Sequence, residues 1–252
     1  MRLLLLGGTT EASALAAALA GRPDIAAILS LAGRTRAPAP APIPMRSGGF
    51  GGAEGLRGYL EAERIDAVVD ATHPFAAQMA RNAAQACAAA GVPLLALSRP
   101  PWARQAGDRW IEVEAMDEAA RALGSAPRRV FLTQGRQQLA AFAAAPQHFY
   151  LLRAIEAPDD LEALPRRRLI LARGPFSRAG EEALLREERI DMLVSKNSGG
   201  DATYAKLEAA RALGLPVVMV RRPARPPVPQ AGSVAEALAW LDGAGRKGAP
   251  RA

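Results

Sequence analysis

The sequence has little cysteine, few aromatic residues and no long apolar run, and each shortage excludes a class of protein. The single cysteine, Cys87, allows no internal disulfide and no thiolate cluster for a metal. Aromatic residues are only 5% of the chain and the basic residues are scattered, so the basic, aromatic-studded surface that binds nucleic acid is not expected. No stretch reaches the roughly 18 uncharged apolar residues that a membrane-spanning helix needs.

A secretory signal is not expected either. The apolar run that follows Met1 is interrupted by Gly7, Gly8 and Glu11, which leaves it too short for the apolar core of a signal peptide. We therefore predict a cytoplasmic protein with no membrane, nucleic-acid or metal partner.

The chain does have length, apolar residues and positive charge. Its 252 residues are 50% hydrophobic, enough for two domains of about 125 residues each. Lysine and arginine outnumber aspartate and glutamate by 32 to 25. The resulting net charge of +7 favours an anionic partner through long-range attraction.

The same pattern occurs twice along the chain, in the same order. Its matched pairs are Arg2–Gly8 with Arg129–Gly135, Glu63–Asp66 with Glu188–Asp191, and Arg99–Pro100 with Arg222–Pro223. Ordered matches of this kind indicate two copies of one structural unit. We predict a first domain over residues 1–125, a second over residues 126–252, a junction near Gly124–Pro127 and a disordered tail over residues 243–252.

Both copies alternate short apolar runs with alanine-rich helical stretches. The predicted strands are Leu3–Leu6, Ile28–Leu31, Ala67–Val69 and Leu94–Leu97 in the first copy, and Val130–Leu132, Phe149–Leu152, Leu169–Leu171, Met192–Val194 and Val217–Val220 in the second. Continuous apolar runs are typical of strands buried on both faces, so the sequence predicts an α/β fold with parallel sheets wrapped by helices. Helices over Asp117–Leu123 and Val234–Leu241 are expected to close the first and the second unit.

A turn with two glycines follows the first predicted strand and opens a helix. Gly7 and Gly8 permit close approach of a phosphate, Thr9 and Thr10 add hydroxyl donors, and Glu11 follows them. The spacing differs from the G-x-G-x-x-G pattern of dinucleotide-binding proteins. Two interpretations stay open: nucleotide binding, or a tight turn with a threonine N-cap.

The end of the second predicted strand bears on the choice of nucleotide. Gly33 and Arg34 follow this strand. At that position an acidic residue accepts a hydrogen bond from the ribose of NAD, whereas an arginine accommodates the 2′-phosphate of NADP. Arg34 therefore favours NADPH, and the alternative is that it is one more surface arginine.

Two further segments of the first copy are candidates. Gly49 and Phe50 belong to a glycine-dense loop that either lies against a flat ligand, with Phe50 stacking on it, or is a flexible turn. Asp70, Thr72 and His73 lie at the carboxyl end of the third predicted strand, the edge that lines the ligand crevice of an open α/β sheet. His73 either supplies or steers a proton, or caps the following helix.

The equivalent edges of the second copy are rich in cations, hydroxyl groups and glycine. The residues are Thr133, Gly135, Arg136, Arg173, Ser195, Lys196, Ser198, Gly199 and Gly200. Cations that converge on one crevice repel each other unless an anion fills it, and guanidinium groups bind carboxylates in a bidentate manner. We expect a carboxylate-bearing ligand here. The alternative is that each cation pairs with a local acidic residue such as Glu156 or Asp201.

Several of these strings together resemble the precorrin-6A reductase family of cobalamin biosynthesis, over nearly the whole chain. They are Gly7–Ala12, Arg46 with Gly48–Gly52, Asp70–Ala76, Arg99–Pro100, Thr133 with Gly135–Arg136, Gly174–Phe176, and Lys196 with Ser198–Gly200. The resemblance implies an enzyme without flavin or metal that passes hydride from a reduced nicotinamide to one double bond of precorrin-6A, giving precorrin-6B. It also implies two Rossmann-like domains with the ligands in the cleft between them, and a substrate that carries many acetate and propionate arms.

We therefore predict NADPH in the first copy and the anionic tetrapyrrole in the second, with neighbouring pathway enzymes as partners that pass the macrocycle on. The predicted cofactor-binding residues are Gly7, Gly8, Thr9, Thr10, Glu11, Gly33, Arg34, Asp70, Ala71 and Thr72. The predicted substrate-binding residues are Gly49 and Phe50 with the second-copy residues named above, and the catalytic candidates are Thr72 and His73. Two alternatives stay open: a cobalt-precorrin-6A reductase that uses NADH, and a non-catalytic two-lobed protein that binds an anion.

Overall fold

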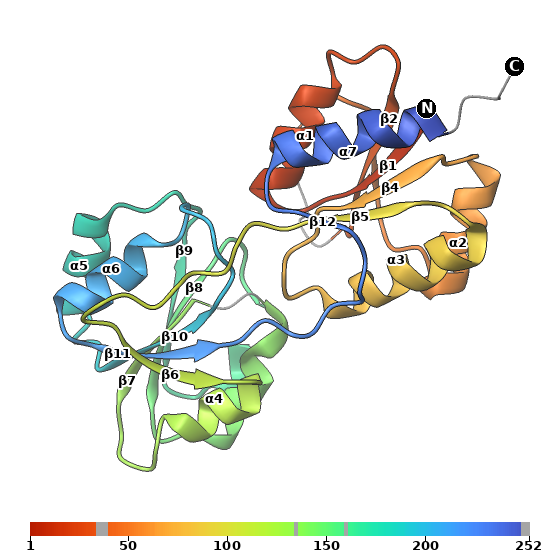
Figure 1. Ribbon diagram of the computed structural model, residues 1–252. Coiled ribbons are helices and arrows are strands. Elements are labelled where there is room, and N and C mark those ends of the chain that lie inside the picture. Colours follow the sequence, from red (N-terminus) through yellow and green to blue (C-terminus); the bar gives the residue numbers. More distant parts are fainter. Residues whose placement is uncertain (34–39, 134–135, 159–160, 248–252) are drawn as a thin grey trace, which may run out of the picture. The chain divides into compact units, whose positions relative to one another are not determined.

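The computed structural model describes residues 1–33, 40–133, 136–158 and 161–247, without the side chains at 136–137 and 244–247 (Figure 1). The chain forms two compact units. Unit 1 comprises Met1–Pro100 and Pro223–Ala252, and unit 2 comprises Pro101–Arg222. Within the described ranges, no helix is both long enough and apolar enough to cross a membrane.

Unit 1 is a six-stranded parallel sheet with the strand order β12-β5-β4-β1-β2-β3. Its elements are β1 (Arg2–Leu6), α1 (Thr10–Leu19), β2 (Ala26–Leu31), β3 (Met45–Ser47), α2 (Gly52–Ala62), β4 (Ala67–Asp70), α3 (Ala77–Ala90), β5 (Leu94–Leu97), β12 (Gln230–Ala231) and α7 (Val234–Lys247). Helices α1 and α7 cover one face of the sheet, and α2 and α3 cover the other (Figure 1).

The apolar run of β1 explains why both faces of this sheet are covered. Successive strand side chains point to opposite faces. Leu3 and Leu5 pack in the core beneath α1 and α7, while Leu4 and Leu6 pack in the core beneath α2 and α3. All four leucines are buried, so a run with no polar alternation is what a central parallel strand requires.

Unit 2 is a second six-stranded parallel sheet, with the order β6-β11-β10-β7-β8-β9. Its elements are β6 (Arg109–Val113), α4 (Met116–Ala122), β7 (Arg129–Leu132), the 3-10 helix η1 (Arg136–Ala144), β8 (Phe149–Ala154), the 3-10 turn η2 (Leu161–Ala163), β9 (Arg167–Leu171), α5 (Arg178–Glu187), β10 (Met192–Lys196), α6 (Ala205–Ala212) and β11 (Pro216–Val220). Phe131, Leu151, Leu193 and Val217 form the centre of a core that includes residues of α5 and α6.

The two sheets have the same strand order once the repeat is taken into account. Strands β1 to β5 correspond to β7 to β11, and each sheet carries one further edge strand. That edge strand is exchanged: β6 follows the first copy in sequence but pairs with β11, and β12 follows the second copy but pairs with β5. The repeat read from the sequence is thus visible in the topology.

The exchange corrects the expected domain boundaries of 1–125 and 126–252. Trp110 of β6 pairs with Val217 of β11, so residues 101–125 belong to unit 2. Ala231 of β12 pairs with Leu97 of β5, so residues 223–252 return to unit 1. The helices predicted to close the first and second units are observed as α4 and α7. Helix α4 belongs to unit 2 and α7 to unit 1, the reverse of what was expected.

The tail prediction also needs a correction. Helix α7 continues to Lys247, so residues 243–247 are helical, and residues 248–252 lie outside the description.

Candidate functional site

The turn between β1 and α1 presents backbone to open space, as the sequence predicts for a phosphate loop. A Cβ added at Gly7 would lie 2.5 Å from Leu29 Cδ1, so a side chain at this position would require Leu29 to shift. Gly8 has a φ of +122°, and a Cβ built there meets nothing within 4 Å. The first backbone N–H groups of a helix lack acceptors within it, and its N-terminus carries partial positive charge. An anion held at this turn against α1 stays a prediction.

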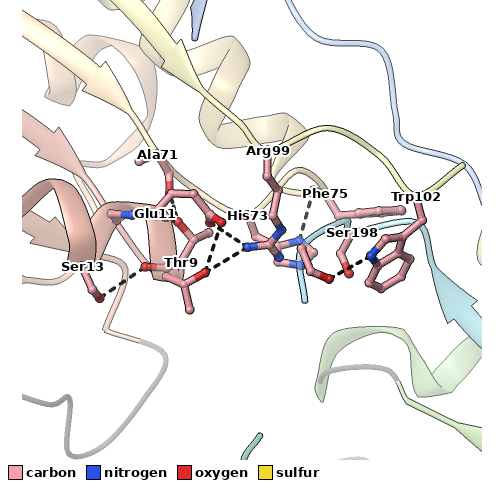
Figure 2. A network of polar contacts seen from close by, with 12 residues as sticks. Thr9, Glu11, Ser13, Ala71, His73, Phe75, Arg99, Trp102 and Ser198 are labelled. Carbon is pink, nitrogen blue, oxygen red and sulfur yellow. Dashed lines mark hydrogen bonds and ion pairs between the residues drawn. The ribbon is translucent and has the colours of Figure 1, made fainter. Parts of the chain in front are cut away.

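Thr9 is the N-cap of α1 and ties this turn to the one after β4. Its Oγ1 accepts the Ala12 N–H at 3.2 Å and donates to the carbonyl oxygen of Ala71 at 2.8 Å (Figure 2). The threonine N-cap, one of the two interpretations left open from the sequence, is observed, and nucleotide binding at this turn stays a prediction. The second bond joins the predicted phosphate loop to the turn that carries Thr72 and His73.

Glu11 and Arg99 form a partly buried ion pair at the mouth of the same turn. The Arg99 Nη1 lies 2.7 Å from Glu11 Oε2 and also donates to Thr10 Oγ1 at 3.4 Å (Figure 2). A carboxylate at the N-terminus of α1 competes with any phosphate for the same field. Arg99 neutralises that carboxylate, and its guanidinium adds further N–H groups beside the turn.

Asp70 organises the turn that follows β4. Its side chain is buried, and Oδ1 accepts both the Thr72 N–H at 3.0 Å and the Thr72 hydroxyl at 2.6 Å. Its other oxygen, Oδ2, accepts a hydrogen bond from Arg225 Nη2 at 2.6 Å. The buried carboxylate therefore fixes Thr72 rather than facing a ligand itself, while Ala71 contributes its carbonyl to Thr9.

His73 lies partly exposed at the end of the same turn. Its Nδ1 accepts the Phe75 N–H at 3.2 Å (Figure 2), and its carbonyl accepts the Ala76 N–H at 2.7 Å. His73 thus shapes the turn before α3, but it does not cap that helix, whose N-cap is Ala76. Its role in supplying or steering a proton stays a prediction.

Phe50 is partly exposed, and its ring contacts Arg46 and Tyr59. The Arg46 guanidinium lies 4.1 Å from the ring centroid, and Tyr59 packs edge-on at 5.2 Å. Arg46 also donates to Ser30 Oγ at 2.7 Å and to the Gly48 carbonyl at 3.1 Å. The ring of Phe50 therefore contacts Arg46 through a cation–π interaction, and its stacking on a flat ligand stays a prediction.

Gly33, Gly49 and Arg34 complete the predicted residues of unit 1. A Cβ at Gly33 would lie 3.4 Å from the Gly48 nitrogen, so the end of β2 packs closely on the glycine loop. Gly49 is exposed. Arg34, on which the choice of NADPH depends, lies outside the described residues. Arg46 pairs with Ser30 in the register of β3 with β2 and donates to Ser30 Oγ near the end of β2.

In unit 2, the loop that follows β10 has the expected glycine conformations. Gly199 and Gly200 have φ values of +67° and +74°. Successive main-chain N–H groups in such a turn form concavities that bind anions. Ser195 and Ser198 are buried, and Lys196 is partly exposed at the end of the strand. These residues lie along one short segment, as the sequence predicts.

This loop is held rigidly by residues that the sequence did not single out. Asn197 accepts the Trp102 N–H at 2.7 Å and donates to its carbonyl at 3.0 Å. The Trp102 indole donates to the Gly200 carbonyl at 2.8 Å (Figure 2). Arg222 donates to the carbonyls of Asn197 and Ser198 at 2.8 and 3.0 Å. The loop is therefore anchored at both ends before any ligand arrives.

The other predicted substrate residues are placed less completely. Thr133 ends β7 and its hydroxyl donates to the Val194 carbonyl at 3.3 Å. Arg173 is exposed after β9. Arg136 begins η1, but its side chain lies outside the description, as does Gly135 altogether. Convergence of the three cations in one crevice stays a prediction.

Metal and thiol chemistry find no support in the described ranges. No group of three or more histidine, cysteine, aspartate or glutamate side chains there is arranged to hold a metal ion. Burial, with a smaller contribution from Asp70, raises the pKa of the Cys87 thiol to about 12. Cys87 is thus a protonated core residue at neutral pH.

The sequence missed Arg225, Trp102 and Asn197, and it noted Arg99 and Arg222 only as repeated Arg-Pro pairs. Those pairs were a usable signal, because each arginine contacts a candidate loop of its own unit. Arg225 had no such signal. It reaches Asp70 across 155 positions in the sequence, through the returning segment.

Comparison with known proteins identifies one family. A family model described as precorrin-6x reductase CbiJ/CobK matches residues 2–242. The precorrin-6A reductase of Rhodobacter capsulatus is 52% identical over 240 residues, which is 95% of each chain. The solved structure of a CobK precorrin-6A reductase matches with a TM-score of 0.92 and 51% identity over 97% of each chain. The cobalt-precorrin-6A reductase of Priestia megaterium is more distant, at 30% identity over 88% of this chain and 90% of its own.

Proposed function

The chain belongs to the precorrin-6x reductase family, and from this we propose that it reduces one double bond of the precorrin-6A macrocycle, giving precorrin-6B, in cobalamin biosynthesis. Identity of 52% to a precorrin-6A reductase against 30% to a cobalt-precorrin-6A reductase favours the metal-free substrate. This also weighs against the two-lobed binding protein as an alternative.

The cofactor we propose is NADPH, held in unit 1. The observation that carries this is the turn from β1 to α1, where a closely packed glycine, an open glycine and a capped helix N-terminus occur in succession. Gly7 and Gly8 let the pyrophosphate approach the backbone, and the N-terminus of α1 compensates its charge, while Arg99 neutralises Glu11 beside it. Arg34 and Arg46 are the proposed partners of the 2′-phosphate.

We assign the substrate carboxylates to unit 2. The anchored loop after β10 offers main-chain N–H groups at Gly199 and Gly200 together with Lys196. Arg136 and Arg173 are the proposed guanidinium partners, because their planar N–H groups match carboxylate geometry. A rigid loop suits a substrate with several acidic arms, since little conformational freedom is lost when they bind.

When bound, reduced nicotinamide supplies the hydride. The protein contributes orientation, exclusion of water and a proton. The turn of Asp70, Thr72 and His73 lies at the carboxyl edge of β4, next to β1 in the sheet. In an open α/β sheet this edge lines the ligand crevice. We assign to Thr72 and His73 the positioning of the reacting groups and the delivery or steering of the proton that follows the hydride.

The direct test is turnover of the purified protein with precorrin-6A and either NADPH or NADH, followed by the fall in absorbance near 340 nm (an approximate wavelength) characteristic of the reduced cofactor. We expect turnover with NADPH in clear preference to NADH. Replacement of Arg136 by alanine should raise KM for precorrin-6A much more than KM for NADPH. Equal increases in both KM values would contradict the assignment of the substrate to unit 2.

A further inference from the structure

Arg225 lies in the segment that returns the chain from unit 2 to unit 1, and it contacts the candidate catalytic turn of unit 1. The segment follows β11 and precedes β12, and Arg225 Nη2 lies 2.6 Å from Asp70 Oδ2. The two side chains are 15% and 3% exposed. This is a largely desolvated, charge-assisted hydrogen bond, which is stronger and more directional than a surface pair.

The other oxygen of the Asp70 carboxylate, Oδ1, already accepts hydrogen bonds from Thr72. Asp70 Oδ1 accepts the N–H and the hydroxyl of Thr72 at 3.0 and 2.6 Å. Arg225 holds Oδ2, so the carboxylate has one orientation, and that orientation sets the position of Thr72. His73 is the next residue in the same turn.

The opposite side of the turn is held from α1. Thr9 donates to the Ala71 carbonyl at 2.8 Å, while its other bond caps the helix. Residues 70–73 are therefore held between the phosphate loop on one side and the returning segment on the other. A turn held in this way keeps Thr72 and His73 at a fixed distance from the proposed cofactor site.

The hydrogen bonding of Arg225 indicates that the contact is not optimised for stability alone. Among the described residues, its Nη1 is buried without a hydrogen-bond partner. A buried unpaired donor is unfavourable, and natural proteins tolerate such groups chiefly where geometry or function requires them.

We infer that Arg225 is a positioning residue for the reduction: it fixes Asp70, and through Asp70 the turn that carries Thr72 and His73. The inference rests on the proposed function, since it takes these two residues to lie beside the reacting groups. It also gives the exchanged C-terminal segment a second role, because the segment supplies an edge strand and orders a site formed by the N-terminal part of the chain.

The experiment compares wild type, Arg225→Gln, Arg225→Lys and the control Arg221→Gln. Arg221 precedes the same segment but pairs with the exposed side chains of Glu112 and Glu114 on unit 2. Steady-state kcat and both KM values are measured with precorrin-6A and NADPH. Hydrogen–deuterium exchange is measured on peptides that cover residues 70–76, and thermal unfolding is followed by circular dichroism.

We expect Arg225→Gln to lower kcat about 10- to 100-fold, since small displacements of reacting groups have effects of this size, with much smaller changes in both KM values. Exchange should rise in residues 70–76 and not across the whole of unit 1. Arg225→Lys retains a cationic donor and should recover most of kcat and of the protection. Arg221→Gln should behave as wild type.

Wild-type kcat and wild-type exchange in Arg225→Gln would overturn the inference. So would a loss of kcat in Arg225→Gln that Arg225→Lys does not recover at all while folding normally. If Arg225→Gln does not fold, the kcat of Arg225→Lys and its hydrogen–deuterium exchange at residues 70–76 test the inference. If the wild type does not turn over precorrin-6A, the proposed function fails, and the exchange data still decide whether Arg225 orders the turn.

Discussion

Two exposed arginines hold a backbone conformation that favours glycine. Arg64 and Arg189 have φ values of +50° and +49° and follow α2 and α5 at equivalent positions of the repeat. A left-handed conformation costs a residue with a Cβ about 1–2 kcal/mol, whereas glycine adopts it freely. Because arginine occupies both positions, the same backbone strain destabilises each of the two units.

Replacement of either arginine by glycine should therefore stabilise the protein. Allowing for the greater freedom of glycine in the unfolded chain, we expect each change to raise the free energy of unfolding by about 0.5–1 kcal/mol. Urea unfolding measures this, with Arg64→Ala and Arg189→Ala as controls that keep the strain. A gain of equal size in the alanine variants would show that the backbone conformation is not the cause.

His148 gives the stability of the protein a dependence on pH. Its side chain is fully buried, and its Nδ1 accepts the Arg128 N–H at 3.2 Å. Burial lowers the pKa of His148 below its ordinary value. The folded protein thus keeps a neutral imidazole at a pH where the unfolded chain, with a pKa of about 6.5, binds a proton.

The sign of the effect follows from that difference. The unfolded state binds more protons below about pH 6.5, so stability is complete above this pH and falls as the pH is lowered, by at most about 1.4 kcal/mol per pH unit. Unfolding free energies measured between pH 7.5 and about pH 5.5 should show this slope in the wild type and in His73→Gln, and a shallower slope in His148→Gln. An unchanged slope in His148→Gln would assign the effect to other groups.

Local sequence rules could predict the contacts of some residues and not those of others. The glycine turn follows from local rules and was predicted, and the Thr9 cap was one of the two interpretations left open there. The contacts of Phe50 with Arg46 and Tyr59 were not predicted, because they are recognised only from packing. Arg225 and Trp102 could not have been predicted, since their contacts depend on which distant segments lie together.

At the scale of elements, β8 and α5 of unit 2 are joined by a buried ion pair. Arg153 of β8 lies against the ring of Phe176, 3.7 Å from its centroid, and its Nη2 donates to Glu181 Oε2 at 2.9 Å. The Arg153 and Glu181 side chains are 7% and 3% exposed. Removal of one charge leaves the other buried and unpaired, which is strongly unfavourable.

Glu181→Gln should therefore lower the free energy of unfolding by about 3–5 kcal/mol. Glu182→Gln is the matched control, because the neighbouring carboxylate pairs with the exposed Arg178 and Arg186 and should matter much less. Denaturant unfolding of both variants makes the comparison. Equal losses of unfolding free energy in the two variants would mean that burial of the Arg153–Glu181 pair does not increase its contribution to stability.

Elements with strong apolar runs were predicted well, and amphipathic or very short ones were not. Strands β1, β4 and β5 match the predicted runs because they are buried on both faces. Strand β6 is an edge strand in which only Trp110 and Val113 are buried, and β12 has only two residues. Such strands are defined by their neighbours in the sheet, so their own residues give little indication of them.

At the scale of the whole molecule, the exchanged edge elements make the N-terminal part of the chain depend on its C-terminal end. Helix α7 contributes the buried Ala237 and Leu241 to the core beneath α1, and β12 covers the edge of β5. The sequence predicted two copies with parallel sheets, but neither the strand order nor the exchange. Each copy contains all the elements of a complete unit, and only pairing in space decides which sheet an edge strand joins.

A chain that ends at Arg222 should consequently lose protection in unit 1 and retain it in unit 2. Hydrogen–deuterium exchange should rise in β1, β4 and β5, while β7, β8 and β10 stay protected, because the exposed core beneath α1 lies in unit 1. A chain that ends at Lys247 is the control and should match the full-length protein. Loss of protection confined to unit 2 would contradict the observed pairing.

The central claim is that unit 1 binds the nicotinamide cofactor through the turn between β1 and α1. A crystal structure of the protein with bound NADP⁺ tests it most directly. The account predicts the pyrophosphate against Gly7, Gly8 and the first turn of α1, with the nicotinamide toward Thr72 and His73. A pyrophosphate on the loop of Lys196 to Gly200 in unit 2 would contradict it.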